Sequence, residues 1–199
     1  MNKKKVFIVC GALLAVALIG GTIAFFNDQI SFENKFKVAD GKVEYSETFD
    51  SPDNWKSCDT TPKTFAITNK STFPVKARVK LEEYWKLPDS TDTSHTTELS
   101  LKRNGENVAI INFASNWSDK WEKQGDWYVY KDVLQNNGDS TTPLIESVTF
   151  NCNQNFAGSV EYSDDHKTGT TTASEYERAK YHLFLTGQTI QAEATSWDD

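Results

Sequence analysis

The stretch FPVKARVKL, residues 73–81, decides the fold class because from Val75 onward its apolar and basic residues alternate strictly. Side chains of a β-strand point to opposite faces in turn, so this stretch has one apolar face and one basic face. The apolar face carries Val75, Ala77, Val79 and Leu81. Burial of one face is typical of an antiparallel sheet. Residues 63–69 also alternate, and we expect them to pair with this strand through a hairpin turn at residues 69–72.

Further alternating segments lie on both sides of this strand, and turn-forming residues separate them. They are residues 42–49, 107–113, 127–134, 145–150 and 156–162. In residues 180–194 the apolar positions change parity at Gly187, which predicts a bulge or bend there. Short strands at this spacing predict an all-β, mainly antiparallel fold: a jelly-roll-like β-sandwich formed by a single domain, residues 42–199.

The N-terminus has the layout of a secretion signal. Three lysines, residues 3–5, precede an uncharged apolar run that ends in small residues. The run is also long enough to span a bilayer, so an uncleaved anchor is the alternative. Residues 1–25 are thus expected to form an apolar helix ahead of the sandwich, and to be its only contact with the membrane. The body of the protein is expected to be secreted or held at the cell surface.

The charge of the chain limits which partners it can bind, and its cysteines allow one disulfide. Loss of residues 1–25 would leave 18 basic and 28 acidic side chains. So acidic a chain argues against nucleic acid, whose phosphates require basic side chains. Cys58 and Cys152 would remain, and an oxidising compartment favours a disulfide between them. The alternative is two buried free thiols, because nothing in the sequence fixes the distance between them.

The residue patterns of common enzymes are missing from the sequence. His95, His166 and His182 are far apart, whereas a zinc protease needs two histidines on one helical face. Asp164 and Asp165 beside His166 could hold a divalent ion weakly, but an ordinary charged loop is the simpler interpretation. No nucleophile elbow, phosphate loop or dinucleotide fingerprint occurs. The sequence therefore assigns no catalytic residue, metal ligand or cofactor.

Large aromatic residues gather between residues 117 and 130, with Trp117, Trp121, Trp127 and Tyr128 close together. Exposed rings could form a sugar-binding platform, which would make the protein a monomeric binding module. Buried rings would instead close one end of the sandwich core. The second interpretation is the simpler one.

Residues 20–28, GGTIAFFND, resemble the signal junction of the TasA and camelysin family of exported proteins. Weaker similarities follow at Phe36 and Gly41, in the alternating strands and near residues 190–194. The resemblance implies cleavage between Phe25 and Phe26 by a SipW-type signal peptidase, and a jelly-roll-like sandwich. It also implies a structural subunit of biofilm matrix fibres that polymerises with itself, with accessory matrix proteins as further partners. Camelysin is classed as a metalloprotease, so a cell-surface protease is the alternative.

The segment that cleavage would free, residues 26–41, has an apolar face. Between residues 26 and 38 its apolar positions all have even numbers: Phe26, Ile30, Phe32, Phe36 and Val38. The resemblance implies that such a segment completes the sheet of the next subunit as a donor strand. Burial of three or four of these side chains would contribute roughly 5–10 kcal/mol before ordering costs. The alternative is that the segment folds back onto its own sheet.

Overall fold

The computed structural model describes residues 25–34, 42–49, 52, 55–87, 89–136, 138–152, 159–162, 169–172, 175–177 and 179–197. Nearly all of the regular structure in these residues is β-strand. Residues 1–24 of the predicted signal lie outside this part of the chain. No helix in the described ranges is both long and apolar enough to cross a membrane.

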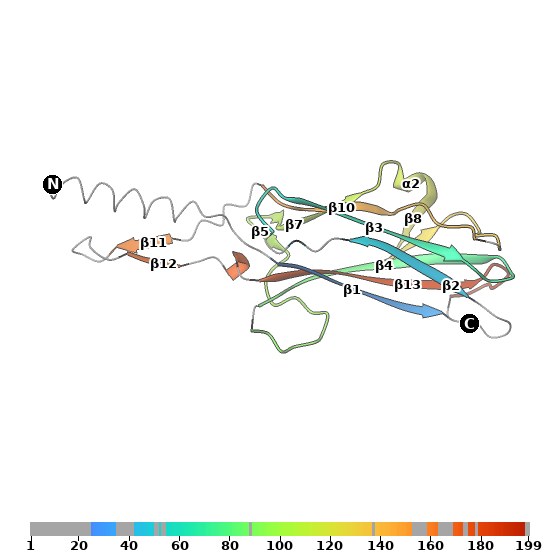
Figure 1. Ribbon diagram of the computed structural model, residues 1–199, viewed down its shortest axis with the longest axis horizontal. Helices are drawn as coiled ribbons and strands as arrows, with labels where there is room; N and C mark the ends of the chain where they lie inside the picture. Colours follow the sequence, from blue (N-terminus) through green and yellow to red (C-terminus); the bar gives the residue numbers. More distant parts are fainter. Residues whose placement is uncertain are drawn as a thin grey trace.

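Two sheets pack face to face and form a β-sandwich (Figure 1). The five-stranded sheet has the order β1 (Phe25–Asn34), β13 (Lys180–Gln191), β4 (Val75–Lys86), β9 (Trp127–Tyr130) and β8 (Trp121–Gln124). The four-stranded sheet has the order β2 (Val43–Phe49), β3 (Thr60–Asn69), β10 (Ile145–Phe150) and β7 (Ala109–Phe113). Within both sheets the pairing is antiparallel, except that β1 runs parallel to β13. The predicted all-β, mainly antiparallel sandwich is confirmed.

Short elements connect the main strands. Two of them form a small hairpin, β5 (Lys102–Arg103) and β6 (Glu106–Asn107), and a single helical turn, α2 (Trp117–Lys120), precedes β8. A second hairpin, β11 (Ser159–Tyr162) and β12 (Gly169–Thr172), lies beyond one end of the sandwich (Figure 1). A 3-10 turn, η1 (Glu175–Glu177), leads into β13.

The core between the sheets is rich in aromatic rings. On β3 and β4 the odd-numbered residues point inward, as the alternation of the sequence predicts. At one end of the core Trp55 stacks on Phe150 with ring centroids 5.0 Å apart, and Trp85 meets Tyr181 at 5.1 Å. Rings of this size dominate the apolar area that folding buries, so these contacts hold the two layers together.

Residues 69–72 do not form the predicted hairpin turn. β3 and β4 belong to different sheets, so the chain crosses from one layer to the other at this corner. The side chain of Asn69, fully buried, holds the corner: its Nδ2 donates hydrogen bonds to the carbonyls of Phe73 at 2.8 Å and Leu134 at 3.0 Å. Its Oδ1 accepts from the Ser71 N–H at 2.9 Å. β3 therefore pairs with β2 and β10, while β4 pairs with β13 and β9.

The predicted bulge at Gly187 is also wrong. β13 pairs with β4 from Lys180 to Gln191 without a shift of register. The inward row continues to Thr189, which is fully buried and hydrogen bonds with the Tyr45 side chain of the other sheet. Ile190 is buried on the opposite face of β13. The apolar residues therefore change from odd to even positions because β13, a continuous strand, is buried on both faces.

Candidate functional site

The predicted donor strand coincides with β1, which is the outer strand of the five-stranded sheet. Its register with β13 places Phe26 opposite Tyr181, Ile30 opposite Leu185 and Phe32 opposite Gly187. These positions of β13 belong to its core-facing row. The ladder thus sets the apolar positions of β1 opposite this row of β13. Phe36 and Val38 lie outside the described residues.

The structure joins Cys58 and Cys152 in a disulfide with their Cα atoms 4.4 Å apart. The bond links the segment before β3 to the end of β10, at the same end of the four-stranded sheet. Backbone hydrogen bonds reinforce this junction, since the Cys58 N–H donates to the Phe150 carbonyl at 2.8 Å and the Phe150 N–H to the Asp59 carbonyl at 2.9 Å. The pair of cysteines has a structural position at the rim of the core.

A cleft of about 430 Å³ lies where β9 ceases to cover β4. β9 pairs with β4 from Arg78 to Lys80, and the following residues of β4 line the cleft together with residues of β7. The apolar lining of the cleft consists of Leu81, Ile110, Ile111, Phe113 and Tyr128. Its polar lining consists of Lys80, Glu83, Asn107, Lys123 and Asp126. Three separate parts of the chain therefore contribute polar groups to one cleft.

Glu83 is the polar residue of this cleft with the least ordinary surroundings. Its half-buried carboxylate accepts a hydrogen bond from the hydroxyl of the fully buried Tyr181 at 2.8 Å. Burial raises the pKa of the Glu83 carboxyl above its ordinary value, and the hydrogen bond from Tyr181 opposes this rise. A partly buried carboxyl group inside a cleft is a common feature of ligand sites.

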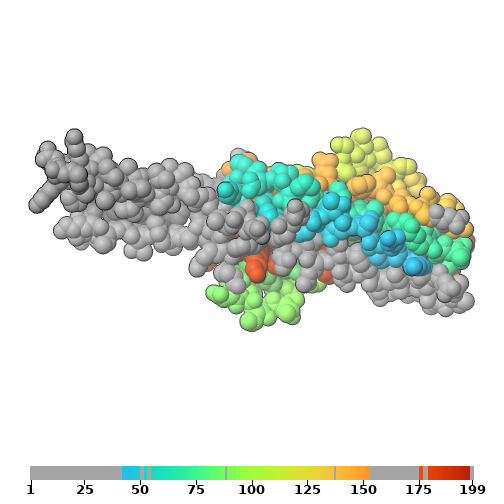
Figure 2. Space-filling model, viewed as in Figure 1, coloured from blue at the N-terminus to red at the C-terminus, as the bar shows by residue number. Residues whose placement is uncertain are grey.

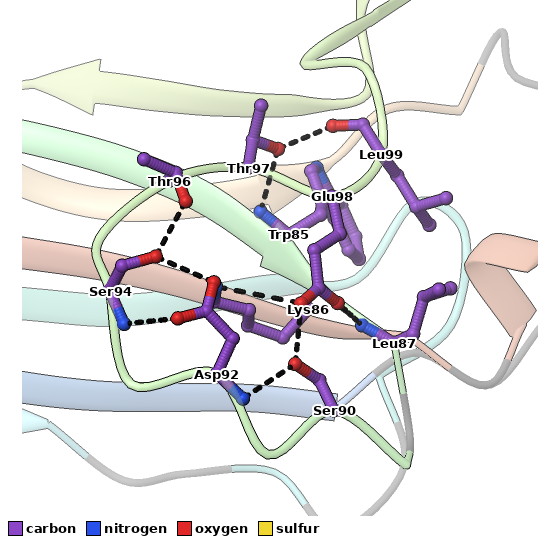
Figure 3. Close-up of polar contacts among 10 residues, drawn as sticks. All are labelled: Trp85, Lys86, Leu87, Ser90, Asp92, Ser94, Thr96, Thr97, Glu98 and Leu99. Atoms are coloured by element: carbon purple, nitrogen blue, oxygen red, sulfur yellow. Dashed lines mark hydrogen bonds and ion pairs between the residues drawn. The ribbon is translucent and has the colours of Figure 1, made fainter.

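The loop of residues 89–98 folds back onto the end of β4 around Lys86 (Figure 3). In the space-filling view this loop, coloured green, stands out from the body of the sandwich (Figure 2). The buried Lys86 Nζ donates to Asp92 at 2.9 Å and lies 3.6 Å from Glu98. The hydrogen bond with Asp92 raises the pKa of Lys86, and Lys86 together with Ser94 lowers the pKa of Asp92. Both carboxylates compensate the buried ammonium group, so this network fastens the loop.

The histidines do not provide a metal site in the described residues. His182 stacks on Tyr84 with ring centroids 4.7 Å apart, and His95 stacks on the same ring at 5.5 Å. Zinc needs at least three nitrogen, sulfur or oxygen ligands from the protein. The described part of the chain contains no group of three or more His, Cys, Asp or Glu that could hold a metal ion. These donors therefore do not fit zinc, while His166 and its two neighbouring aspartates lie outside the described residues.

The aromatic cluster of residues 117–130 mainly belongs to the core. Trp121 and Tyr130 are buried and meet edge to face, with ring centroids 4.9 Å apart. Trp117 is half-buried against Tyr128, at 5.6 Å. Trp127 stacks on the Arg78 guanidinium, 4.1 Å from its ring. The simpler interpretation, that these rings close one end of the core, is confirmed for Trp121 and Tyr130.

A comparison with protein families shows the affiliation of the chain. Residues 1–171 match the family described as camelysin metallo-endopeptidase. The chain belongs to this family. The resemblance read from residues 20–28 is thereby confirmed, and the family is a group of cell-surface or secreted proteins related to TasA. No curated protein and no solved structure matches the chain significantly.

Sequence reasoning missed the cleft, because its existence depends on where β9 ends. One signal was available: Glu83 follows Val79 and Leu81 in the inward row of β4, where a carboxyl group is exceptional. Lys63 is likewise a charged residue in the inward row of β3, where it is fully buried and forms an ion pair with Glu47. Polar residues in an apolar row are therefore the pattern to search for.

Proposed function

We propose that this protein is a secreted structural subunit of cell-surface or extracellular matrix fibres, and that copies assemble by exchanging strand β1. The observation that carries the proposal is the position of β1, an outer strand of ten residues that pairs in parallel with β13. An identical strand from a second copy can form the same ladder on β13. Each exchange that does not close on itself extends a chain of subunits.

The expected cleavage site supports this proposal. The Phe25–Phe26 bond lies at the first residue of β1. Cleavage there would leave residues 26–34 in the strand and would separate them from the apolar signal. Before cleavage the strand is tied to the membrane, whereas afterwards its N-terminal end is free to reach a neighbouring copy.

The energetics of exchange explain why assembly should depend on concentration. A strand supplied by a neighbour makes the same contacts as the strand of the same chain, so the interaction energy cancels to a first approximation. The balance is then set by the local concentration of neighbouring copies. Export to a crowded cell surface favours the intermolecular pairing.

A designed disulfide between β1 and β13 tests the proposal. Ser31 lies opposite Thr186 in the ladder, so the double variant Ser31→Cys, Thr186→Cys can close β1 onto its own chain. We expect the oxidised double variant, expressed with a SipW-type peptidase, to remain monomeric and to form filaments after mild reduction. A mixture of the two single variants should give covalent dimers on oxidation, because each chain carries one added thiol, and each single variant alone is the matched control.

Two outcomes would contradict strand exchange. One is filament formation by the oxidised double variant at the rate of the wild-type chain, because its β1 cannot leave. The other is a mixture of single variants that forms filaments without covalent dimers, because β1 and β13 of different copies would then not be neighbours. Mass spectrometry of the exported chain shows whether it begins at Phe26.

The family name supports a second candidate, a cell-surface metallo-endopeptidase. The donor set of the described residues does not fit zinc, so we derive no catalytic step through a metal. Zinc analysis of the purified exported chain, with a peptide-cleavage assay before and after chelation, tests this candidate. Stoichiometric zinc with chelator-sensitive cleavage would favour the protease over a purely structural subunit.

A further inference from the structure

The outer face of the four-stranded sheet is built from short side chains, many of which carry a hydroxyl group. Along β3 the odd-numbered residues are buried in the core, so the even-numbered residues point outward. The register sets the outward residues of β2 and β10 beside them, because residues directly opposite each other in an antiparallel pair share a face. These outward residues are exposed or half-exposed. We call this surface the hydroxyl face, and its central residues are Ser46, Thr48, Thr60, Thr64, Ser147 and Thr149.

Hydrogen bonds within the hydroxyl face already pair several of its polar groups. The Asn112 Nδ2 of β7 donates to Ser147 Oγ at 3.0 Å and to Thr149 Oγ1 at 2.8 Å. The hydroxyls of Thr149 and Thr60 hydrogen bond with each other at 2.8 Å. One network therefore crosses β7, β10 and β3. Polar groups that are paired within a surface lose less when that surface is covered than groups that depend on water.

The hydroxyl face carries little charge, although the chain has a formal net charge of −7. Within the described strands its charged residues lie at the margins. Glu44, near one end, forms an ion pair with Lys70 at 3.4 Å, and Glu146 lies at the bulge of β10. Net charge of one sign makes copies of a protein repel each other, so a charge-poor face is where two copies approach at the lowest cost. The outward row of β4, in the other sheet, contrasts with it and contains Lys76, Arg78, Lys80 and Glu82.

We propose that two copies of this chain associate through their hydroxyl faces, stacked sheet against sheet. Hydroxyl and amide groups both donate and accept hydrogen bonds, so this surface can face a copy of itself across a two-fold axis. Its short side chains let two sheets approach closely. Ile110, whose side chain is 37% exposed, lies opposite Thr149 and gains an apolar cover in the stack.

A carbohydrate polymer fits the hydroxyl face less well than a second copy does. Exposed aromatic rings are the side chains on which sugar rings pack. The outward positions of the described strands β2, β3, β7 and β10 contain no aromatic residue. The second copy therefore remains the occupant that the chemistry of the face favours.

The size of the face predicts a weak interaction between single copies. Its strands have between 5 and 10 residues and lie about 4.8 Å apart, which gives roughly 450 Å² per copy. Such an area is at the low end of specific protein interfaces. In a fibre built by exchange of β1, which rests on the function proposed above, many hydroxyl faces would act together and would hold fibres side by side. β1 belongs to the other sheet, so both associations can occur at once.

The oxidised double variant Ser31→Cys, Thr186→Cys separates this association from strand exchange, because its β1 is locked onto its own chain. Sedimentation of the locked chain should show a reversible monomer–dimer equilibrium at submillimolar concentration. The amide signals of Ser46, Thr64 and Thr149 should shift on dilution in nuclear magnetic resonance spectra. Higher salt concentration should strengthen the dimer, because it screens the repulsion between acidic chains.

A negative charge in the hydroxyl face of the locked chain should break the stack. Ser46→Glu and Thr64→Glu each add this charge to a surface that faces its own copy, so each should weaken the dimer about tenfold or more. Gln124→Glu is the matched control, since it makes the same change of charge at an exposed position of β8 in the other sheet. It should dimerise as the locked parent does. Melting curves show that each variant is folded.

Four results would overturn the proposal. The first is a locked chain that stays monomeric up to roughly 1 mM. The second is a dimer that folded Ser46→Glu and Thr64→Glu chains form as readily as the parent, and the third is a dimer that salt weakens. The fourth is a monomeric chain whose hydroxyl-face signals shift with cellohexaose, which would assign the face to a polysaccharide. Because the locked chain cannot exchange β1, none of these results depends on strand exchange.

Discussion

The variant Asn69→Ala, at the corner between the two sheets, should destabilise the fold more than the replacement of a surface asparagine by alanine would. Besides Phe73 and Leu134, the Asn69 Nδ2 also reaches the Gln135 carbonyl at 3.1 Å. The Phe73 carbonyl also accepts from the Ser71 hydroxyl, and the Leu134 carbonyl from the Val75 N–H. These two carbonyls therefore keep a donor after Asn69→Ala. Gln135 is exposed, so water can replace its lost partner.

The largest cost arises at Ser71, whose buried N–H donates to the Asn69 Oδ1. A buried donor without a partner costs about 1–3 kcal/mol. Loss of the amide hydrogen bonds adds roughly 1 kcal/mol, so Asn69→Ala should lower the free energy of unfolding by about 2–4 kcal/mol. In a chain of this size the melting temperature should fall by roughly 4–16 °C.

Chemical denaturation with matched variants measures this effect. Asn112→Ala is the control, because the Asn112 amide donates to Ser147 at 3.0 Å and Thr149 at 2.8 Å on a half-exposed face where water can replace it. It should cost less than about 1 kcal/mol. Asn69→Asp should be worse than Asn69→Ala at pH 7 and recover partly at pH 4, because a protonated carboxyl regains one donor. Equal losses for the alanine variants of Asn69 and Asn112 would refute the reasoning.

Three further changes test other parts of the fold. Serine at both Cys58 and Cys152 opens a loop that the disulfide closes over 94 residues, and the chain-entropy relation predicts a loss of up to about 4.7 kcal/mol, measured by denaturation with and without reductant. Glu47→Ala removes the carboxylate beside the buried Lys63 ammonium group, so it should lower the free energy of unfolding by about 3–5 kcal/mol. Lys63→Met should lower it by less than about 1 kcal/mol. Equal losses for the two variants would contradict this reasoning. Burial raises the pKa of Tyr45 to about 12, so the folded state holds this proton more tightly and stability should fall as pH rises above about 10. Tyr45→Phe should flatten that fall in pH-dependent melting curves.

Much of the sandwich could be predicted from alternation alone, because burial of one face imposes a period of two on the sequence. The strand around Val79 and the segment that became β10 were identified in this way. The partners of these strands could not be identified. Residues 69–72 have the composition of a hairpin turn, but the hydrogen bonds of Asn69 to carbonyls more than sixty residues away select a crossing between sheets.

Polar residues in inward rows explain most of what sequence reasoning missed. Thr189 continues the inward row of β13 because Tyr45 of the other sheet hydrogen bonds with it, and no local pattern contains that partner. Glu83 is accommodated in the same way by the Tyr181 hydroxyl. Such pairs join residues 98 and 144 positions apart in the sequence. They become visible when the two sheets are placed face to face.

The parallel ladder between β1 and β13 connects the fold to the proposed assembly. It joins residues about 155 positions apart in the sequence, so its loop-closure cost exceeds that of the neighbouring antiparallel pairs. β13 can pair with β4 before β1 docks, and contacts of high sequence separation generally form late. During that interval the free edge of β13 can accept a strand of the same sequence from a second copy. The covalent dimers expected from the mixed Ser31→Cys and Thr186→Cys chains would therefore report competition between two identical strands for one edge.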